Sequence, residues 1–360
     1  MIKSILISLA LLFATVQGAI AQGFNWSVDL NAFFDNREGD DFYTPAETIF
    51  ATRLAPEIGI SFLGGAHSIA GGVSWIQPVG NSWNDYKLCP TLYYRYMSPT
   101  WRFTFGMLPR TQLIEHLPNA LWSDKMAFNE PNIRGFLIQY VRPQGYAELS
   151  LDWRGLQSET QREAFNVNFN GEWNPKGIFL IGGHVMVNHF AKQKNPPAGQ
   201  NIVDDMVVNP MIGINLSKVT PLDSFTIKGG LLLSLERDRN NDNWQTPCGA
   251  LIDIVAEWRF LGIKNTLYAG KAQFPLYGDF GAALNMGEPY YQAPFYNRTN
   301  VYAYVFRNRF VNLEASLNFH VTKKAFGFQQ QLLLRVYMDN ELWSKRNEKN
   351  ARGEHLRNIY

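Results

Sequence analysis

The sequence predicts an all-β protein: a transmembrane, up-and-down antiparallel β-barrel of about sixteen strands, with the count open by about two in either direction. Three observations predict this fold. Apolar and polar residues alternate with a period of two along most of the chain. The connections between the alternating segments are short and long in turn. An apolar run stands at the N-terminus, but no later run is long enough to cross a membrane as a helix, so a closed barrel is the remaining way to satisfy the backbone in lipid.

Residues 164–190 show the alternation most clearly. One parity carries large apolar residues, which are Phe165, Val167, Phe169 and Trp173. The other parity carries amides and a carboxylate, which are Asn166, Asn168, Asn170 and Glu172. Residues 174–177 have the composition of a tight turn, and the apolar parity resumes after them. Because successive side chains of a strand point to opposite faces, this stretch predicts a hairpin with lipid on one face and water on the other.

The same pattern repeats along the chain, in segments that are mostly close to the ~9–11 residues of a tilted membrane strand. The predicted strands are residues 24–35, 48–62, 68–79, 88–97, 101–108, 133–141, 146–155, the two strands of 164–190, 207–218, 225–236, 250–260, 266–275, 300–306, 311–321 and 328–338.

The connections sort by length. Short ones are predicted at 63–67, 97–100, 142–145, 174–177, 219–223, 260–262 and 307–310. Long ones are predicted at 36–45, 80–87, 110–132, 156–163, 191–205, 237–247 and 278–299, while 322–327 is a short exception. Tight periplasmic turns and larger extracellular loops are typical of outer-membrane barrels.

The first 21 residues indicate a secretory signal peptide, with Lys3 before an apolar run and Ala19-Ile20-Ala21 as the cleavage site. The expected organisation is a signal peptide at 1–21, a barrel at 22–340 in a Gram-negative outer membrane, and a charged periplasmic tail or short helix at 341–360. Cys89 and Cys248 are expected to be unpaired, since they fall on distant walls of the barrel.

Charged residues on the polar parity are expected to line a water-filled lumen. They are Arg53, Glu57, Arg95, Arg102, Glu148, Asp152, Arg154, Glu172, Asp253, Glu257, Arg259, Glu314 and Arg335. The alternative is that they pair with each other across the strands of the wall, each pair contributing ~0.2–1 kcal/mol. The two signs are close to balance, so neither anion nor cation selectivity is predicted. A net charge of +2 gives no support to a nucleic-acid partner, and none is expected.

Two of the long loops carry aromatic residues, which are Trp122, Tyr290, Tyr291, Phe295 and Tyr296. These loops are expected to fold into the mouth as a constriction, to form a sugar-stacking platform, or to pack as a cap. A third loop spaces Asp238, Asn240 and Asp242 like the first ligands of a calcium loop, although Gly249 stands where a bidentate Glu belongs. Weak Ca²⁺ binding is a hypothesis there, a solvated polar loop is the alternative, and no other cofactor is expected.

No catalytic residues are expected, and the chain is not predicted to be an enzyme. His184 and His189 fall on opposite faces of one strand and cannot share a metal. Ser316, Asn318 and His320 share a face, but alternation assigns it to the lumen, whereas a barrel lipase needs its nucleophile and base at the lipid boundary.

Several stretches carry a resemblance to a known group of proteins. They are residues 34–38, 48–57, 105–110, 151–153, 157–163, 296–299 and 329–331. On these stretches the chain resembles the porin-like outer-membrane barrels of the Bacteroides lineage. The resemblance implies an outer-membrane barrel and offers no catalytic residues to transfer.

The expected function is therefore a porin-like channel for passive diffusion of small polar solutes, surrounded by outer-membrane lipid. Such a barrel is open to assembly as a homotrimer or with an outer-membrane partner protein. Two alternatives stay open: a non-conducting barrel that serves as a scaffold, adhesin or complex partner, and, less favoured, a barrel lipid hydrolase.

Overall fold

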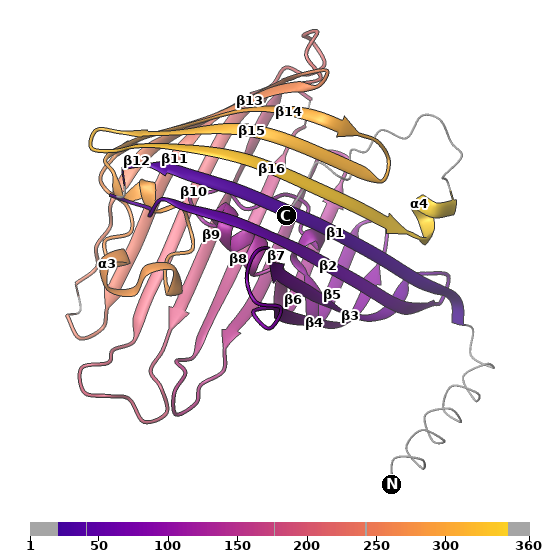
Figure 1. Cartoon of the computed structure of the whole chain (residues 1–360), viewed down its shortest axis with the longest axis horizontal. Helices are drawn as coiled ribbons and strands as arrows, with labels where there is room; N and C mark the ends of the chain where they lie inside the picture. Colours follow the sequence, from indigo (N-terminus) through magenta and orange to yellow (C-terminus); the bar gives the residue numbers. More distant parts are fainter. Residues whose placement is uncertain (1–20, 41, 176, 242, 345–360) are drawn as a thin grey trace.

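Sixteen strands form one closed antiparallel barrel in the computed structural model, which describes residues 21–40, 42–175, 177–241 and 243–344 (Figure 1). Each strand pairs with its neighbours in sequence, and β1 pairs antiparallel with β16 to close the barrel. The predicted fold class and strand number are confirmed. The predicted signal peptide lies outside the described residues except for Ala21, and the predicted tail is described only as far as Ser344, where the short helix α4 (Asn340–Ser344) ends.

The strands are β1 (Ala21–Gly39), β2 (Glu47–Phe62), β3 (His67–Pro78), β4 (Lys87–Met97), β5 (Trp101–Pro109), β6 (Asn132–Arg142), β7 (Gly145–Gly155), β8 (Ala164–Trp173), β9 (Phe179–Phe190), β10 (Val203–Asn215), β11 (Ser224–Asp238), β12 (Cys248–Trp258), β13 (Leu261–Gly270), β14 (Phe295–Arg307), β15 (Val311–Thr322) and β16 (Phe326–Asp339). Short helical segments lie in the loops: η2 (Arg110–Gln112), α2 (Asp124–Asn129), α3 (Tyr277–Phe280), η3 (Gly281–Ala283) and η4 (Pro289–Gln292). No helix in the described part of the chain is long and apolar enough to cross a membrane.

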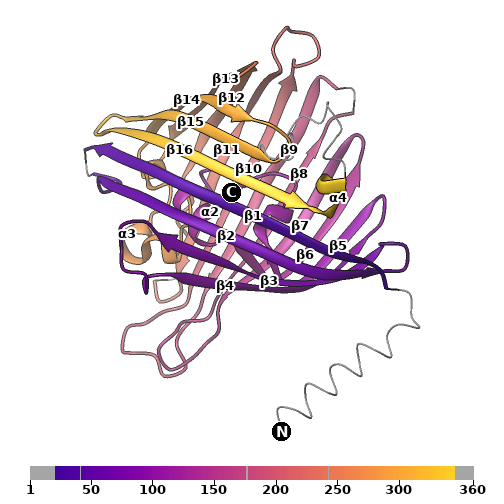
Figure 2. The same cartoon turned by 45° about the vertical axis from the view of Figure 1, so that its right-hand side comes forward.

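Alternation sorts the side chains as the sequence predicts. In β8, Phe169 and Trp173 are exposed on the outer wall, while Asn166 and Asn168 are fully buried on the inner face. The loop that carries α3 lies at one end of the barrel, and β1 starts and β16 ends at the other (Figure 2). We call these the outer end and the periplasmic end, following the sorting of long loops and short turns in outer-membrane barrels.

Two strands begin five residues earlier than predicted, at residues 261 and 295 instead of 266 and 300. The cause is the turn after Trp258, where Arg259 adopts a positive φ of 57° and the chain reverses at once. The strand pairing then runs from Leu261, opposite Ala303, to Ala269, opposite Phe295. This also corrects the prediction for Arg259, which does not face the lumen. It is exposed in the turn, with its guanidinium 4.8 Å from the ring centroid of Trp258.

The loop between β5 and β6 folds into the interior, carries α2 and occupies part of the lumen (Figure 2). Its Leu121 and Trp122 are buried in one cluster with wall residues such as Leu108 and with Tyr291 from the loop between β13 and β14. Phe128 of α2 stacks on Phe33 of β1 at 5.0 Å between ring centroids. The lumen is therefore divided by packed side chains.

Candidate functional site

The inward loop is fixed to the wall by a buried ion pair at its start. Arg110 Nη2 donates to Asp152 Oδ2 at 2.6 Å and to the carbonyl oxygen of Asn132 at 3.0 Å. Its guanidinium also lies 4.0 Å from the ring centroid of Trp122. A few residues on, the backbone N–H of Ile114 donates to Glu148 of β7. These contacts hold the loop against β6 and β7.

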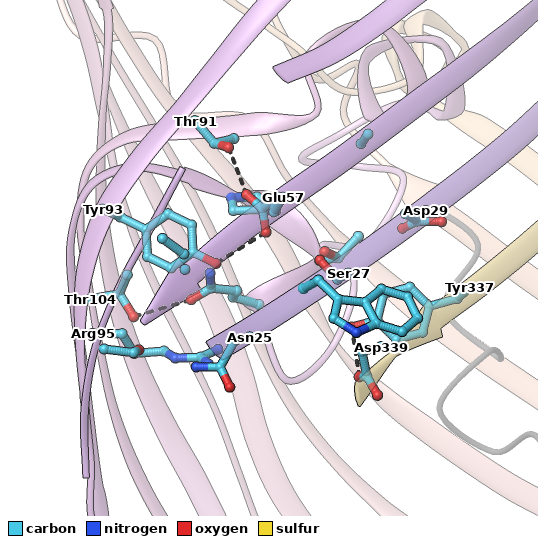
Figure 3. A pocket seen from close by; sticks show the side chains of 18 of the residues that line it. Asn25, Ser27, Asp29, Glu57, Thr91, Tyr93, Arg95, Thr104, Tyr337 and Asp339 are labelled. Carbon is cyan, nitrogen blue, oxygen red and sulfur yellow. Dashed lines mark hydrogen bonds between the residues drawn. The ribbon is translucent and has the colours of Figure 1, made fainter. Parts of the chain in front are cut away.

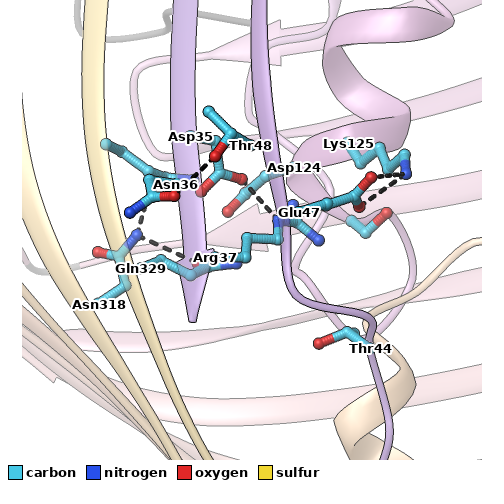
Figure 4. A network of polar contacts seen from close by, with 12 residues as sticks. Asp35, Asn36, Arg37, Thr44, Glu47, Thr48, Asp124, Lys125, Asn318 and Gln329 are labelled. Carbon is cyan, nitrogen blue, oxygen red and sulfur yellow. Dashed lines mark hydrogen bonds and ion pairs between the residues drawn. The ribbon is translucent and has the colours of Figure 1, made fainter. Parts of the chain in front are cut away.

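A second polar network fixes α2 to the opposite wall, at the outer ends of β1, β2 and β14 (Figure 4). Lys125 Nζ donates to both oxygens of Glu47 at 2.8 and 3.0 Å. Asp124 accepts from Arg298 at 2.6 Å, and Asp35 accepts from Arg37 at 2.7 Å. The helix N-cap is Ser123, which accepts from the backbone N–H of Met126.

Glu288 is a buried carboxyl group in the same region. It is 1% exposed and lies 3.9 Å from Arg298 Nη1. Burial raises the pKa of Glu288, and the nearby positive charges of Arg37 and Arg298 oppose that rise. This network joins three wall strands to two loops, so its evident role is to close the outer end of the barrel.

A cavity of about 840 Å³ remains between the inward loop and the wall made by β1–β5 and β16 (Figure 3). It reaches the periplasmic end, since Asn25, Met97 and Asn340 line it. A second cavity of about 260 Å³ lies on the other side of the loop, between His116 and β14–β16.

Apart from Arg259, the charged residues predicted on the polar parity face the interior. Arg53, Glu57, Arg95, Arg102 and Arg335 line the larger cavity, and Glu257 and Glu314 line the smaller one. Glu148 and Asp152 hold the inward loop, and Arg154 Nη2 donates to the carbonyl oxygen of Ala283. Several pair across strands: Arg335 binds Asp29, Lys228 binds Glu172, and Thr266 donates to Asp253.

The loop aromatics pack as a cap. Trp122, Tyr290 and Tyr291 are each less than 5% exposed, so they offer no open face to a sugar. Phe295 and Tyr296 belong to β14 and not to the loop.

Asp238 and Asn240 of the predicted calcium loop bond to protein groups, since Asp238 accepts from Asn201 Nδ2 and from the backbone N–H of Asn240. Asp242 lies outside the described residues. In the described part of the chain, no three His, Cys, Asp or Glu side chains are grouped for a metal ion. The calcium hypothesis stays a prediction.

The histidine on β15 bonds to a tyrosine and to an amide, and not to Ser316. His320 Nδ1 bonds to the Tyr296 hydroxyl at 2.7 Å and its Nε2 bonds to Gln329 at 3.0 Å. Ser316 contacts Gln331 instead, so Ser316 and His320 are not paired. Both face the interior, as alternation predicts. Cys89 and Cys248 are free thiols.

A row of outward-facing side chains crosses five neighbouring strands near their outer ends. Direct register partners link Trp153 to Phe165, Phe165 to His189, His189 to Asp204, and Asp204 to Arg237, from β7 to β11. We call these five residues, together with Arg239 at the end, the outer row.

Polar and aromatic contacts connect neighbouring residues of the outer row. His189 Nδ1 lies 3.6 Å from Asp204 Oδ1. Arg237 Nη2 donates to Asp204 Oδ2 at 2.9 Å, and Arg239 donates to both carboxylate oxygens at 2.8 Å. Phe165 lies 5.0 Å from the His189 ring, between ring centroids. A His–carboxylate pair with two guanidiniums and an aromatic floor thus stands on the wall that faces lipid.

Sequence reasoning placed His184 and His189 on opposite faces of one strand but missed the outer row. Asp204 was placed in a loop, because the predicted strand began at 207 and not at Val203. Only the register between β9 and β10 shows that these two residues are neighbours, and alternation within one strand carries no register information.

A family model described as "Lipid A 3'-O-deacylase-type" matches residues 17–345. No curated protein matches the chain. Among solved structures, the chain is similar to three Pseudomonas aeruginosa proteins. These are OccK1 (OpdK), OccK8 (OprE) and OccK9 (OpdG), each 9% identical to this chain over 89% of its length. The TM-scores are 0.52, 0.54 and 0.54, and the match covers 100%, 99% and 100% of the respective structures. At this identity the likeness concerns the fold alone, which is that of outer-membrane barrels.

Two expectations from the sequence are therefore wrong. The predicted passive channel, with its role in transport, is overturned by the family match, and so is the prediction that the chain is not an enzyme. The matching family is that of a deacylase, which is an enzyme in a barrel. The resemblance to porin-like barrels holds for the fold and for the outer membrane.

Proposed function

The chain belongs to the lipid A 3'-O-deacylase-type family, and we propose that it is an esterase that removes an acyl chain from a lipid A-type glycolipid. The observation that carries this proposal is the outer row, above all the pairing of His189 with Asp204. An acyl ester at the surface of the outer leaflet reaches this part of the wall from the lipid, without entering the barrel.

The chemistry we propose is hydrolysis by general base catalysis. In the tautomer that carries its proton on Nδ1, toward Asp204, His189 has Nε2 available to accept a proton. A water molecule gives that proton to Nε2 as its oxygen attacks the ester carbonyl carbon. The tetrahedral oxyanion then collapses, the bond to the sugar oxygen breaks, and Nε2 returns the proton to that oxygen. The products are a fatty acid and a free sugar hydroxyl.

Asp204 and the arginines have separate parts in this scheme. Asp204 fixes the ring orientation and stabilises the imidazolium that forms. Arg237 and Arg239 hold Asp204 and bring positive charge to the place where an oxyanion develops and where a phosphorylated sugar would rest. Phe165 and Trp153, stacked at 5.3 Å between ring centroids, give an apolar floor for the acyl chain beside them.

The test is to incubate the purified, folded protein with 3'-O-acylated lipid A in mixed micelles, and to follow both products by mass spectrometry. We expect lipid A that has lost one acyl chain, together with an equal amount of free fatty acid. Folded protein that leaves lipid A unchanged would overturn the proposal. Origin in the Bacteroides lineage and assembly with a second copy or a partner protein stay expectations.

A further inference from the structure

The larger interior cavity has an unusual charge pattern on its wall. Most charged side chains that line it are already bonded to the protein. Arg335 donates to both oxygens of Asp29 at 3.0 and 2.8 Å. Glu57 accepts from Thr91 at 2.6 Å and from the Tyr93 hydroxyl at 3.1 Å (Figure 3).

Two arginines on this wall differ from the rest. Arg95 of β4 and Arg102 of β5 both line the cavity near the periplasmic end. Within the described part of the chain, neither guanidinium is hydrogen-bonded or in an ion pair, although Glu57 is within electrostatic reach of Arg95. The Nε of Arg95 is buried without a hydrogen-bond partner.

The register makes these two arginines neighbours. Arg95 is paired with Thr104, and Met97 is paired with Arg102, so the two guanidiniums start from diagonal positions on adjacent strands. Side chains in this relation are about 7–8 Å apart at their bases and within reach of one another when long. Two like charges that share one cavity repel each other, and the repulsion is removed when an anion lies between them.

The surroundings suit an oxyanion. Ser68, directly opposite Arg95 in the register with β3, adds a hydroxyl to the same wall. Guanidinium forks match the planar geometry of carboxylate and phosphate oxygens. A cavity of about 840 Å³ also leaves room for an organic body attached to the anionic group.

We infer that this cavity binds a small oxyanion, a carboxylate or a phosphate, between Arg95 and Arg102, and that the ligand enters from the periplasmic end. This inference does not depend on the proposed esterase activity, because the outer row lies on the outer face of β7–β11, whereas the cavity lies inside the wall made by β1–β5 and β16.

Isothermal titration calorimetry tests it, on the full-length protein folded in detergent at constant ionic strength in chloride. Sodium phosphate and sodium benzoate are titrated separately. We expect saturable binding of at least one probe, and the probe that binds distinguishes a phosphate site from a carboxylate site. The double variant Arg95→Gln/Arg102→Gln should bind at least about tenfold more weakly, because it loses the charge-assisted hydrogen bonds.

Arg142→Gln is the matched control, because Arg142 is exposed at the end of β6 and does not line the cavity. It should bind like the wild type. The slower gel migration of the protein after heating verifies that each variant is folded. Absence of saturable heat with both probes, or unchanged affinity in the folded double variant, would overturn the inference.

Discussion

His189 Nδ1 lies 3.6 Å from Asp204 Oδ1, and the two residues are direct register partners on β9 and β10. Their side chains point outward, and two arginines bind the same carboxylate. On a lipid-facing wall a charged or polar side chain is costly, and its cost falls near the membrane boundary. A cluster of four such residues at the outer ends of the strands therefore calls for a functional explanation, and the proposed ester hydrolysis is one.

Substituting Asp204→Asn should lower kcat by roughly 10²–10⁴-fold with little change in KM, because in the proposed mechanism Asp204 acts through His189 and not on the substrate. An amide stabilises the imidazolium less than a carboxylate does. The acid limb of the pH–rate profile should therefore move to lower pH. Steady-state kinetics between pH 5 and 9 checks both effects. An acid limb at the same pH in the variant and the wild type would show that Asp204 has only a structural role.

Substituting Arg239→Gln should lower kcat/KM by roughly 10–100-fold, with part of the loss in KM. Arg239 forms two of the three hydrogen bonds that arginines give Asp204, and it is the more exposed of the two, so it is the one best placed to meet a phosphorylated sugar. A substrate lacking phosphate should show a smaller loss. An equal loss on both substrates would contradict a phosphate-binding role.

Substituting Arg110→Ala should lower the free energy of unfolding by roughly 1–3 kcal/mol, because it removes the shorter ion pair of the buried Asp152 carboxylate and leaves Arg134, 3.4 Å away, as its remaining partner. Urea unfolding in detergent, followed by tryptophan fluorescence, measures this. Arg142→Ala is the control, since Arg142 is exposed in the wall near the β6–β7 turn and its loss should change little. Similar stabilities for the two variants would show that the inward loop is not fixed by Arg110.

Stability should fall as the pH is lowered from ~6.5 to about 4, in part because of His116. Burial, with Lys264 and Arg335 nearby, lowers the pKa of His116 to about 4. The folded state therefore binds fewer protons than the unfolded state within this window, so acid favours unfolding there. The neighbouring Glu115 acts with the opposite sign, since burial raises its pKa.

The contribution of His116 is isolated by comparison with His116→Gln. The variant should lose less stability than the wild type over that window, as measured by urea midpoints at pH 7 and pH 4.5. Equal losses in the two proteins would mean that His116 does not titrate with folding.

Much of the fold could be predicted because apolar and polar residues alternate within each strand, and this pattern can be read from the local sequence. The pattern around Phe169 and Asn168 predicts which face of the strand faces lipid. The loop lengths predict which end of the barrel is the outer end and which is the periplasmic end. The turn at Arg259 was misplaced because its tightness depends on one positive φ in a non-glycine residue, which composition does not reveal.

The site was harder to predict than the barrel. A channel barrel and an enzyme barrel show the same alternation of apolar and polar residues, so this pattern could not distinguish the two functions. The residues that could distinguish an enzyme are polar side chains on the outward face, such as His189. Within its own strand each of them is a single exception to the apolar pattern of that face. They become a site only when the register aligns β9, β10 and β11.

The most direct measurement of the central claim is the rate of acyl release from 3'-O-acylated lipid A by His189→Gln, beside wild type and His67→Gln. His67 is the matched control: it also faces outward, but at the periplasmic end, where its Nδ1 bonds to the Tyr94 hydroxyl at 2.7 Å. We predict that His189→Gln loses about 10²–10⁴-fold in kcat, as expected for the loss of a general base, while His67→Gln matches wild type. Full activity in folded His189→Gln would contradict the account.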